Sequence, residues 1–442
     1  MIKKLIVILI TIIGCQTFAQ QGTASPYSFY GIGSLKFRGT VENLGMGSIG
    51  SYIDSLHINL RNPASYAGKN LKTDPYNGES RPVKFTVAGS FSSVSLNSNT
   101  ESQNANTSTF DYLAVSIPLG RFGAGFGLLP FTSVGYKLQD INPVNERIDF
   151  RYEGEGGLNK AFFSLGYLVN DNLSIGVDAN YNFGSTENSA IQFIYDSDGN
   201  IIQLSTRETN RSDLSGLNFN LGAAYKGKIS DKLELSATAT FAPESSLNSI
   251  NDRSISTVFV TTLGDEFVQN TIDVDLVTDG LEETDLNLPS RFALGAGIGE
   301  ASKWFIGAEY VAQNTSVFDN PLLGSTIDNT SFEDASSFAI GGFYLPSYRS
   351  LSSYFKRVTY RAGARFENTG LVVNDESINE FGISFGLGLP IGPQTGVFSE
   401  INLGFEYGQR GTKNSNLIQE NFFNFNLSLS LSDRWFQKRK YN

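Results

Sequence analysis

The sequence predicts an all-β fold, a fourteen-stranded antiparallel transmembrane β-barrel with an N-terminal plug folded into its lumen. Apolar and polar residues alternate in runs of about ten residues, as in strands that turn one face toward lipid. No run after the N-terminus approaches the roughly eighteen apolar residues of a membrane-spanning helix. Short turns alternate with mostly longer polar loops between the runs, which is the pattern of an outer-membrane barrel.

The N-terminus has the pattern of a secretory signal peptide over residues 1–19. Lys3 and Lys4 precede an apolar run from 5 to 13, and small residues lead to a cleavage site after Ala19. The alternative is a lipoprotein signal that is cut before Cys15, the only cysteine of the chain. We favour cleavage after Ala19, because a barrel is already anchored in the membrane and gains little from one lipid.

Residues 20–82 are predicted to form the plug. They are too polar and glycine-rich for lipid-facing strands, yet they carry apolar and aromatic side chains that a free tail would leave in water. Within this segment, Pro63 moves Asn62 out of the α region, and an Asn side chain can bond the backbone of a local turn. We therefore expect Asn62, Pro63 and Ala64 to form a tight turn of the plug.

Residues 83–436 are predicted to form the barrel, with long extracellular loops. An even number of strands returns both chain ends to the same side of the membrane, which we expect to be the periplasm. The short turns then lie on the periplasmic side and the long loops outside. The predicted strands lie near 83–96, 110–118, 121–136, 160–169, 173–183, 215–226, 233–241, 289–298, 303–312, 336–345, 357–366, 379–389, 399–407 and 421–432.

The last strand shows the barrel pattern most clearly. Apolar residues alternate with Asn and Ser from 423 to 431, and Trp435 and Phe436 follow at the expected boundary between lipid and water. The basic tail 437–442 is then periplasmic. We expect a solvated chain end, and the alternative is contact with a partner or with lipid headgroups.

The third predicted strand contains Gly125, Gly127 and Pro130 in its interior. Proline cannot donate to a strand ladder and is confined to edges and bulges, so Pro130 predicts an interruption of this strand. The interruption has two interpretations. It opens the barrel wall sideways, or it is a simple bulge without an opening.

One outer connection is predicted to project as a β-ribbon over residues 190–208. Two alternating arms flank Asp198-Gly199, a pair that suits a hairpin turn. The same turn resembles the start of a calcium loop, but Ile201 and Arg207 occupy positions that require Gly and Glu. We interpret the segment as a plain turn.

The formal net charge of −11 is concentrated in residues 242–288. This acidic outer loop includes Asp265, Glu266, Asp273, Asp275 and Asp279 and has one base, Arg253. Because phosphate binding requires a basic surface, a nucleic-acid partner is excluded. A solvated acidic loop is the simplest interpretation, and binding of divalent ions is the alternative.

The sequence offers no constellation for catalysis, so we predict that the protein is not an enzyme. His57 is the only histidine, and no G-x-S-x-G motif accompanies it, so a packed plug residue is expected there. A metal cluster of His and Cys cannot form in the mature chain, and no cofactor is predicted. The glycine runs 123–127 and 295–299 lack the spacing and the following helix of a nucleotide loop.

The chain resembles the FadL-like family, outer-membrane channels for long-chain fatty acids and aromatic hydrocarbons. The resemblance rests on GMGSIGSYIDSLHINLRNPASYA at 45–67, the fourteen strands and LPSRFALGAGIG at 288–299. It implies a plug, or hatch, in the lumen, in which Asn62-Pro63-Ala64 matches the family's tripeptide. It also implies a kinked third strand through which an apolar ligand leaves the lumen into the bilayer.

Two functions follow from the resemblance. The first is passive uptake of hydrophobic small molecules across the bacterial outer membrane, with lateral release near Pro130. The acidic loops and the lack of a recognisable pocket base favour a neutral or cationic apolar ligand. The alternative is a barrel that serves as scaffold or shuttle subunit of an outer-membrane secretion or assembly complex. The expected partners are membrane lipid, an apolar ligand, and a complex partner in the second case.

Overall fold

The computed structural model describes residues 22–435 except 55, 73–77, 79, 143, 200, 203, 262–265, 318–328 and 392–398. The predicted signal peptide, Cys15, Asp265 and the basic tail lie outside the described residues. In the described part, no helix is long and apolar enough to cross a membrane. The short helices are η1 (Pro26–Phe29), α2 (Val41–Leu44), η2 (Pro63–Tyr66), η3 (Thr315–Val317), η4 (Phe355–Arg357) and η5 (Asn414–Asn416).

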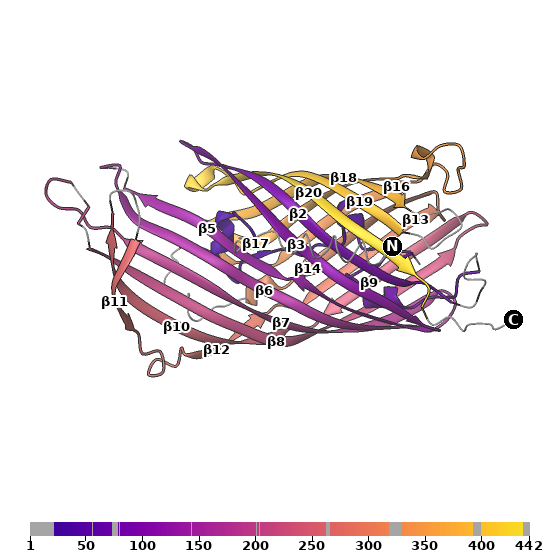
Figure 1. Cartoon of the computed structure of the whole chain (residues 1–442), viewed down its shortest axis with the longest axis horizontal. Coiled ribbons are helices and arrows are strands. Elements are labelled where there is room, and N and C mark those ends of the chain that lie inside the picture. Colours follow the sequence, from indigo (N-terminus) through magenta and orange to yellow (C-terminus); the bar gives the residue numbers. More distant parts are fainter. Residues whose placement is uncertain are drawn as a thin grey trace.

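The described strands form a closed antiparallel barrel of fourteen strands (Figure 1). The first barrel strand pairs with the last, from Val83↔Asp433 to Asn97↔Gln419, which closes the wall. Three barrel strands are each interrupted, as β4 and β5, β9 and β10, and β12 and β13. The strands are β1 (Ser34–Leu35), β2 (Val83–Asn97), β3 (Ser102–Leu119), β4 (Phe122–Pro130), β5 (Thr132–Ile141), β6 (Ile148–Leu168), β7 (Leu173–Gln192), β8 (Leu204–Lys228), β9 (Leu233–Ala242), β10 (Ser245–Val260), β11 (Glu266–Asp273), β12 (Glu283–Leu288), β13 (Arg291–Glu300), β14 (Trp304–Gln313), β15 (Thr330–Phe332), β16 (Ala335–Tyr344), β17 (Thr359–Val373), β18 (Glu376–Ile391), β19 (Ser399–Arg410) and β20 (Gln419–Asp433).

Side chains alternate across the wall as the sequence predicts, with apolar residues outside and polar residues inside. In β20, Phe423 and Leu427 are exposed, while Asn426 and Ser428 are buried against the lumen. This distribution is inverted relative to a soluble sandwich, because the solvent of the outer face is hydrocarbon. The fold class expected from the alternation is therefore confirmed.

The segment 242–288 was expected as an acidic loop, and this expectation is wrong for most of its length. β10, β11 and β12 occupy it, and β10 pairs with β8 from Asn248↔Ser215 to Phe259↔Leu204. The strands continue beyond the lipid-facing part of the wall and form a tall extension at the left of Figure 1. Apolar residues fall on both faces there, as Val258 and Phe259 show, so the alternation of apolar and polar residues used to find strands is weak.

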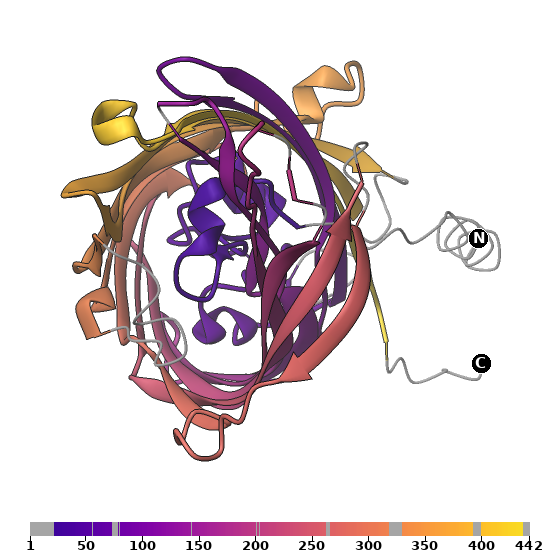
Figure 2. The same cartoon turned by 90° about the vertical axis from the view of Figure 1, so that its left-hand side faces the viewer.

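The N-terminal segment from residue 22 onward runs inside the barrel, where Figure 2 shows its helices within the ring of strands. The β1 strand pairs with β5, through Ser34↔Ser133 and Leu35↔Thr132. Helix α2 lies against β18, β19 and β20, and η2 lies against β6, β7 and β8. The two helices thus contact different walls of the barrel.

The predicted ribbon at 190–208 is a hairpin whose arms extend β7 and β8. Tyr195 pairs with Ile201 across the turn, and Gly199 adopts a φ of 88°. Such a positive φ suits glycine in a hairpin turn. The interpretation as a plain turn agrees with this geometry.

Candidate functional site

The third barrel strand is interrupted at Pro130, as the sequence predicts. β4 ends at Pro130, and its pairing with β3 already stops at Leu113↔Leu128. After the break, β5 pairs with β6 and with β1, but it has no described pairing with β3. The part of β3 from Ser102 to Tyr112 therefore lacks a neighbour on this side in the described ladders.

The N-terminal segment covers the edge of β5 that the break exposes. Lys36 N donates to Phe131 O at 3.0 Å, and Phe131 N donates to Leu158 O at 2.7 Å. Further along, Gly135 N donates to the hydroxyl of Ser28 at 3.1 Å. Backbone groups at the interruption are thus satisfied by β6 of the wall on one side and by the N-terminal segment on the other, as buried groups require.

The predicted turn at Asn62-Pro63-Ala64 begins helix η2. Asn62 has an extended backbone, with φ −136° and ψ 113°, and its side chain accepts a hydrogen bond from Ala64 N at 2.9 Å. Both features were expected from the proline that follows and from the turn chemistry of Asn. The amide of Asn62 also donates to Ala223 O on β8 at 3.0 Å, which fixes η2 to the wall.

Lumen-facing glycines cradle η2 against four strands. A Cβ atom at Gly176 or Gly222 would overlap Pro63, and one at Gly125 would overlap the ring of Tyr66. The plug backbone therefore approaches the wall more closely than any larger residue would allow. We name this set the glycine cradle; its members are Gly123, Gly125, Gly166, Gly176 and Gly222.

The two glycines predicted at the opening serve different neighbours. Gly125 faces the plug and belongs to the glycine cradle. At Gly127, a Cβ would meet the carbonyl of Leu113 and the ring of Phe162, next to the place where β3 and β4 separate. Only Gly127 of the pair lies at the interruption itself.

The opposite wall holds the plug through buried charges. Arg38 of the plug donates to Glu380 of β18 at 2.8 Å, and Arg61 pairs with Glu309 of β14. Glu42 accepts hydrogen bonds from Asn402 at 2.8 Å and from Ser430 at 2.7 Å. Burial makes these contacts costly to break singly, because the remaining partner would be left unpaired in the interior.

Glu380 is the centre of a charged cluster that the wall itself completes. Its carboxylate pairs with Arg365 of β17 and accepts from Arg410 Nε of β19 at 2.6 Å, in addition to Arg38. The side chain of Glu380 is fully buried. We call these four residues, Arg38, Arg365, Glu380 and Arg410, the Glu380 cluster.

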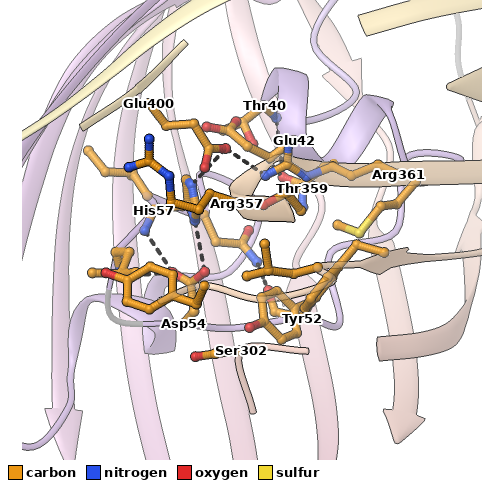
Figure 3. A pocket seen from close by; sticks show the side chains of 18 residues that line it. Thr40, Glu42, Tyr52, Asp54, His57, Ser302, Arg357, Thr359, Arg361 and Glu400 are labelled. Carbon is orange, nitrogen blue, oxygen red and sulfur yellow. Dashed lines mark hydrogen bonds and ion pairs between the residues drawn. The ribbon is translucent and has the colours of Figure 1, made fainter. Parts of the chain in front are cut away.

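A small cavity of about 80 Å³ lies beside the plug and contains the only histidine (Figure 3). His57 Nδ1 lies 2.8 Å from Asp54 and Nε2 lies 3.4 Å from Glu400. Burial lowers the pKa of His57, but the two carboxylates outweigh burial and raise this pKa well above its ordinary value. Burial raises the pKa of Asp54, and the His57 cation outweighs this effect and lowers it well below the usual range. His57 therefore acts as a charged link between plug and wall.

A larger cavity of about 340 Å³ lies inside the barrel beside the interruption. Apolar side chains line part of it, and the cations Lys160 and Arg291 line another part together with the carboxylates of Asp178 and Glu309. Among the described residues, no carboxylate lies within 4.0 Å of either cation. Lys160 lies over the ring of Phe131, 4.2 Å from its centroid. The apolar lining residues are Ile32, Leu35, Phe37, Leu60, Leu129, Phe131 and Phe162.

Sequence reasoning missed these cations, because neither belongs to a motif that marks it as part of a binding site. Lys160 follows Asn159 within an otherwise apolar and glycine-rich run, and Arg291 opens β13. Their proximity to one cavity arises only when the strands are closed into a barrel. No base was recognisable in the sequence, and the structure places Lys160 and Arg291 at this cavity.

The acidic residues of the outer extension are spread along it. Glu266 pairs with Arg151 and Arg207, Asp273 ends β11, and Asp275 accepts from its own turn at Thr278. Asp279 lies in the same turn. Over the described ranges, no group of three acidic, His or Cys side chains is placed to hold a metal ion.

Comparison with solved structures shows the fold. The Pseudomonas putida toluene transporter TodX superposes with a TM-score of 0.56 at 14% identity, covering 90% of this chain and 99% of that one. A Pseudomonas aeruginosa FadL homologue gives 0.53 at 15%, covering 90% and 99%. The Ralstonia pickettii toluene transporter TbuX gives 0.54 at 12%, covering 88% and 97%. The resemblance to FadL-like barrels is thereby confirmed at the level of the fold.

Sequence comparison places the chain in a family. No curated protein matches it. A family model described as BamG matches residues 1–442, which is the whole chain. From its sequence and its FadL-like plugged barrel together, the chain belongs to the BamG family.

Proposed function

We propose that this protein is a plugged outer-membrane barrel that acts as a subunit of an outer-membrane protein assembly complex, with both termini in the periplasm. The observation that carries the proposal is that the plug is bonded to opposite walls of the barrel. Asn62 bonds β8 on one side, while Arg38 and Arg61 bond β18 and β14 on the other. Membership of the BamG family favours the assembly role.

A fixed plug suits a structural subunit better than a channel. For a molecule to pass, the plug would have to give up the Arg38–Glu380 pair, the Arg61–Glu309 pair and the contacts of Glu42 together. Passive uptake has only the transfer of apolar area as its driving force. The same contacts give a platform a rigid interior, because packed and bonded cores deform little.

The test is native mass spectrometry of the protein extracted from its own outer membrane in mild detergent. The proposal expects a stoichiometric protein partner on the barrel. A lone barrel that carries a small apolar adduct would contradict the assembly role and would favour transport.

A second function is favoured by the interruption and the cavity next to it. In this alternative, a hydrophobic molecule enters from outside, occupies the cavity of about 340 Å³, and leaves sideways near Pro130 into the bilayer. Lys160 and Arg291 would suit an anionic group on an apolar ligand, in place of the neutral or cationic ligand expected from the loops.

Pro130→Val tests the lateral route. Valine can donate to the ladder, so pairing of the third strand with β3 would be restored. The alternative expects reduced uptake from a barrel that remains folded, as measured by resistance to unfolding in detergent. Unchanged uptake by the folded variant would contradict lateral release.

A further inference from the structure

We propose that the sheet above the membrane band docks an extended basic segment of a partner polypeptide, which adds to β11 as a further strand. This outer sheet consists of residues 204–213 of β8, residues 248–260 of β10, and β11. The proposal deepens the proposed function, because it names the surface and the chemistry of one partner of the complex.

The outer sheet lies beyond the lipid-facing band of the wall. On β7, the outward residues Tyr181 and Phe183 are apolar and exposed, and the next outward residue is Ser185. On β8, the exposed apolar series ends at Leu217, and Asp213 and Arg211 follow on the same face. Polar residues at these positions mark the upper boundary of the band. Apolar exposure above this boundary therefore does not face lipid tails.

One face of the outer sheet carries a patch of exposed apolar side chains. The uninterrupted register with Leu214 and Leu247 makes this face the continuation of the lumen-facing side of the wall. The register places Leu204, Phe259 and Phe267 in one row across β8, β10 and β11. Ile255 and Ile272 form a second row on the same face, because directly paired residues of antiparallel strands share a face. Phe267 is 56% exposed and Ile272 is 63% exposed. The polar row of Thr206, Thr257 and Asn270 lies between the two apolar rows, so this face offers a partner apolar contacts that alternate with polar ones.

The β11 strand also offers a free edge. Its eight residues pair with β10, from Ser254↔Asp273 to Val260↔Glu266, and the described pairings give no neighbour on the other side. An unpaired edge presents a row of N–H and C=O groups that can take up another strand. Added strands gain affinity from the backbone and specificity from side-chain contacts on the adjoining face.

The opposite face of the outer sheet is buried near the end of β10, whereas every residue of β11 after Glu266 is exposed. Ile191, Phe193, Val258 and Val260 form a cluster there. Glu266 closes this layer by pairing with Arg151 of β6. Pairing with β10 and the ion pair of Glu266 position β11 before a partner arrives, which lowers the entropy lost on binding.

Charge identifies the kind of partner. The chain has no Lys or Arg between Arg253 and Arg291, whereas Asp273, Asp275 and Asp279 lie at or after the end of β11. A second copy of this chain would bring like charges together at the edge, which is unfavourable. An extended segment that alternates apolar and basic residues matches both the patch and the charge.

The test uses the full-length protein in zwitterionic detergent and a short fluorescent peptide in which Lys alternates with Val. Binding is followed by anisotropy, and hydrogen exchange reports protection of the amides in β11. Two matched peptides serve as controls, one with Glu in place of Lys, and one with alternate amides N-methylated. The variant is Phe267→Lys with Ile272→Lys, and Val144→Lys, at an exposed valine of another outer loop, is its control.

The proposal expects saturable binding of the Lys–Val peptide with slower exchange in 266–273. Binding should weaken about tenfold or more in the double variant and in the N-methylated peptide, and remain unchanged in Val144→Lys. Equal binding of the Glu–Val peptide, equal binding of the N-methylated peptide, or absence of protection in β11 would overturn it. If native barrels carry a stoichiometric partner but do not bind the peptide at β11, the assembly role stands and only the docking surface is refuted.

Discussion

The two walls of the barrel hold one plug by different physical means. The wall of β4, β6, β7 and β8 accepts η2 through the glycine cradle, where absent side chains let backbones meet. The wall of β14 and β17–β20 accepts the plug through buried ion pairs such as those of the Glu380 cluster. The second wall also uses shape, because a Cβ at Gly341 or Gly363 would overlap the backbone of Met46, but it adds buried ion pairs. The two walls should therefore respond differently when a charge is removed.

Glu380→Ala is expected to have the largest effect. The change leaves three guanidinium groups without their shared carboxylate in the interior, and breaking a buried pair in this way costs about 3–5 kcal/mol. Urea unfolding from lipid vesicles, followed by Trp fluorescence, measures the free energy of unfolding. Glu376→Ala, near the end of the same strand, is the control, and a loss no greater than the control's would refute the role of the cluster.

Gly176→Val tests the wall that holds η2 through the glycine cradle. The valine side chain would overlap the backbone of Pro63, so η2 must move. We expect this overpacking to lower the free energy of unfolding by about 1–3 kcal/mol. We expect the barrel to persist while residues 22–72 become sensitive to protease. Ala179→Val, at an outward-facing position of the same strand, controls for the added volume. Equal protection in both variants would show that the cradle does not position the plug.

The pH dependence should follow His57. Because its folded pKa is raised above the unfolded value of about 6.5, its stabilisation is fully present below that pH and is lost as pH rises through the folded pKa. Asp54 acts in the opposite direction, since its lowered pKa gives stabilisation that is lost only on strong acidification. As the pH rises from 6 to 10, we therefore expect the free energy of unfolding to fall.

His57→Gln should flatten this alkaline loss. The comparison is made by thermal unfolding of both proteins at a series of pH values. A wild-type curve that runs parallel to that of the variant would mean that the His57 link contributes nothing to stability in this range.

The smallest effect is expected in the outer extension. Asp279→Asn removes a solvent-exposed charge from the turn after β11, and surface charges contribute little. The free energy of unfolding should change by less than about 0.5 kcal/mol. A loss as large as that of Glu380→Ala would mean that the extension, and not the plug-bearing walls, dominates stability.

The sequence predicted those parts of the molecule that depend on local chemistry. Alternation identified β20, proline chemistry located the break after Pro130, and Asn62 formed its expected cap. The strands in 242–288 were missed, because neither face of a strand above the membrane meets lipid. Apolar residues such as Val258 and Phe259 then fall on both faces, and the apolar alternation disappears. Polar alternation alone does not distinguish such strands from loops.

The contacts between plug and wall could not be predicted from the sequence. Arg38 and Glu380 are 342 positions apart, and neither residue has a local signal for its partner. In the sequence, the glycines of the cradle cannot be distinguished from other small residues of a strand, because their contact with η2 exists only in the closed barrel. Closure is a property of the whole sheet, so residues that meet across the lumen carry no common pattern.

The central claim is that the plug is a fixed part of the barrel, and a disulfide tests it directly. A Cβ at Gly404 would lie 3.2 Å from Cγ1 of Val41, which suits a bridge between Val41→Cys and Gly404→Cys. The measurement is the partner stoichiometry of the oxidised double variant by native mass spectrometry, with the reduced protein and both single variants as controls. We expect the oxidised barrel to carry its partner at the wild-type ratio. Loss of the partner on oxidation, restored by reduction, would show that the plug must move and would contradict the claim.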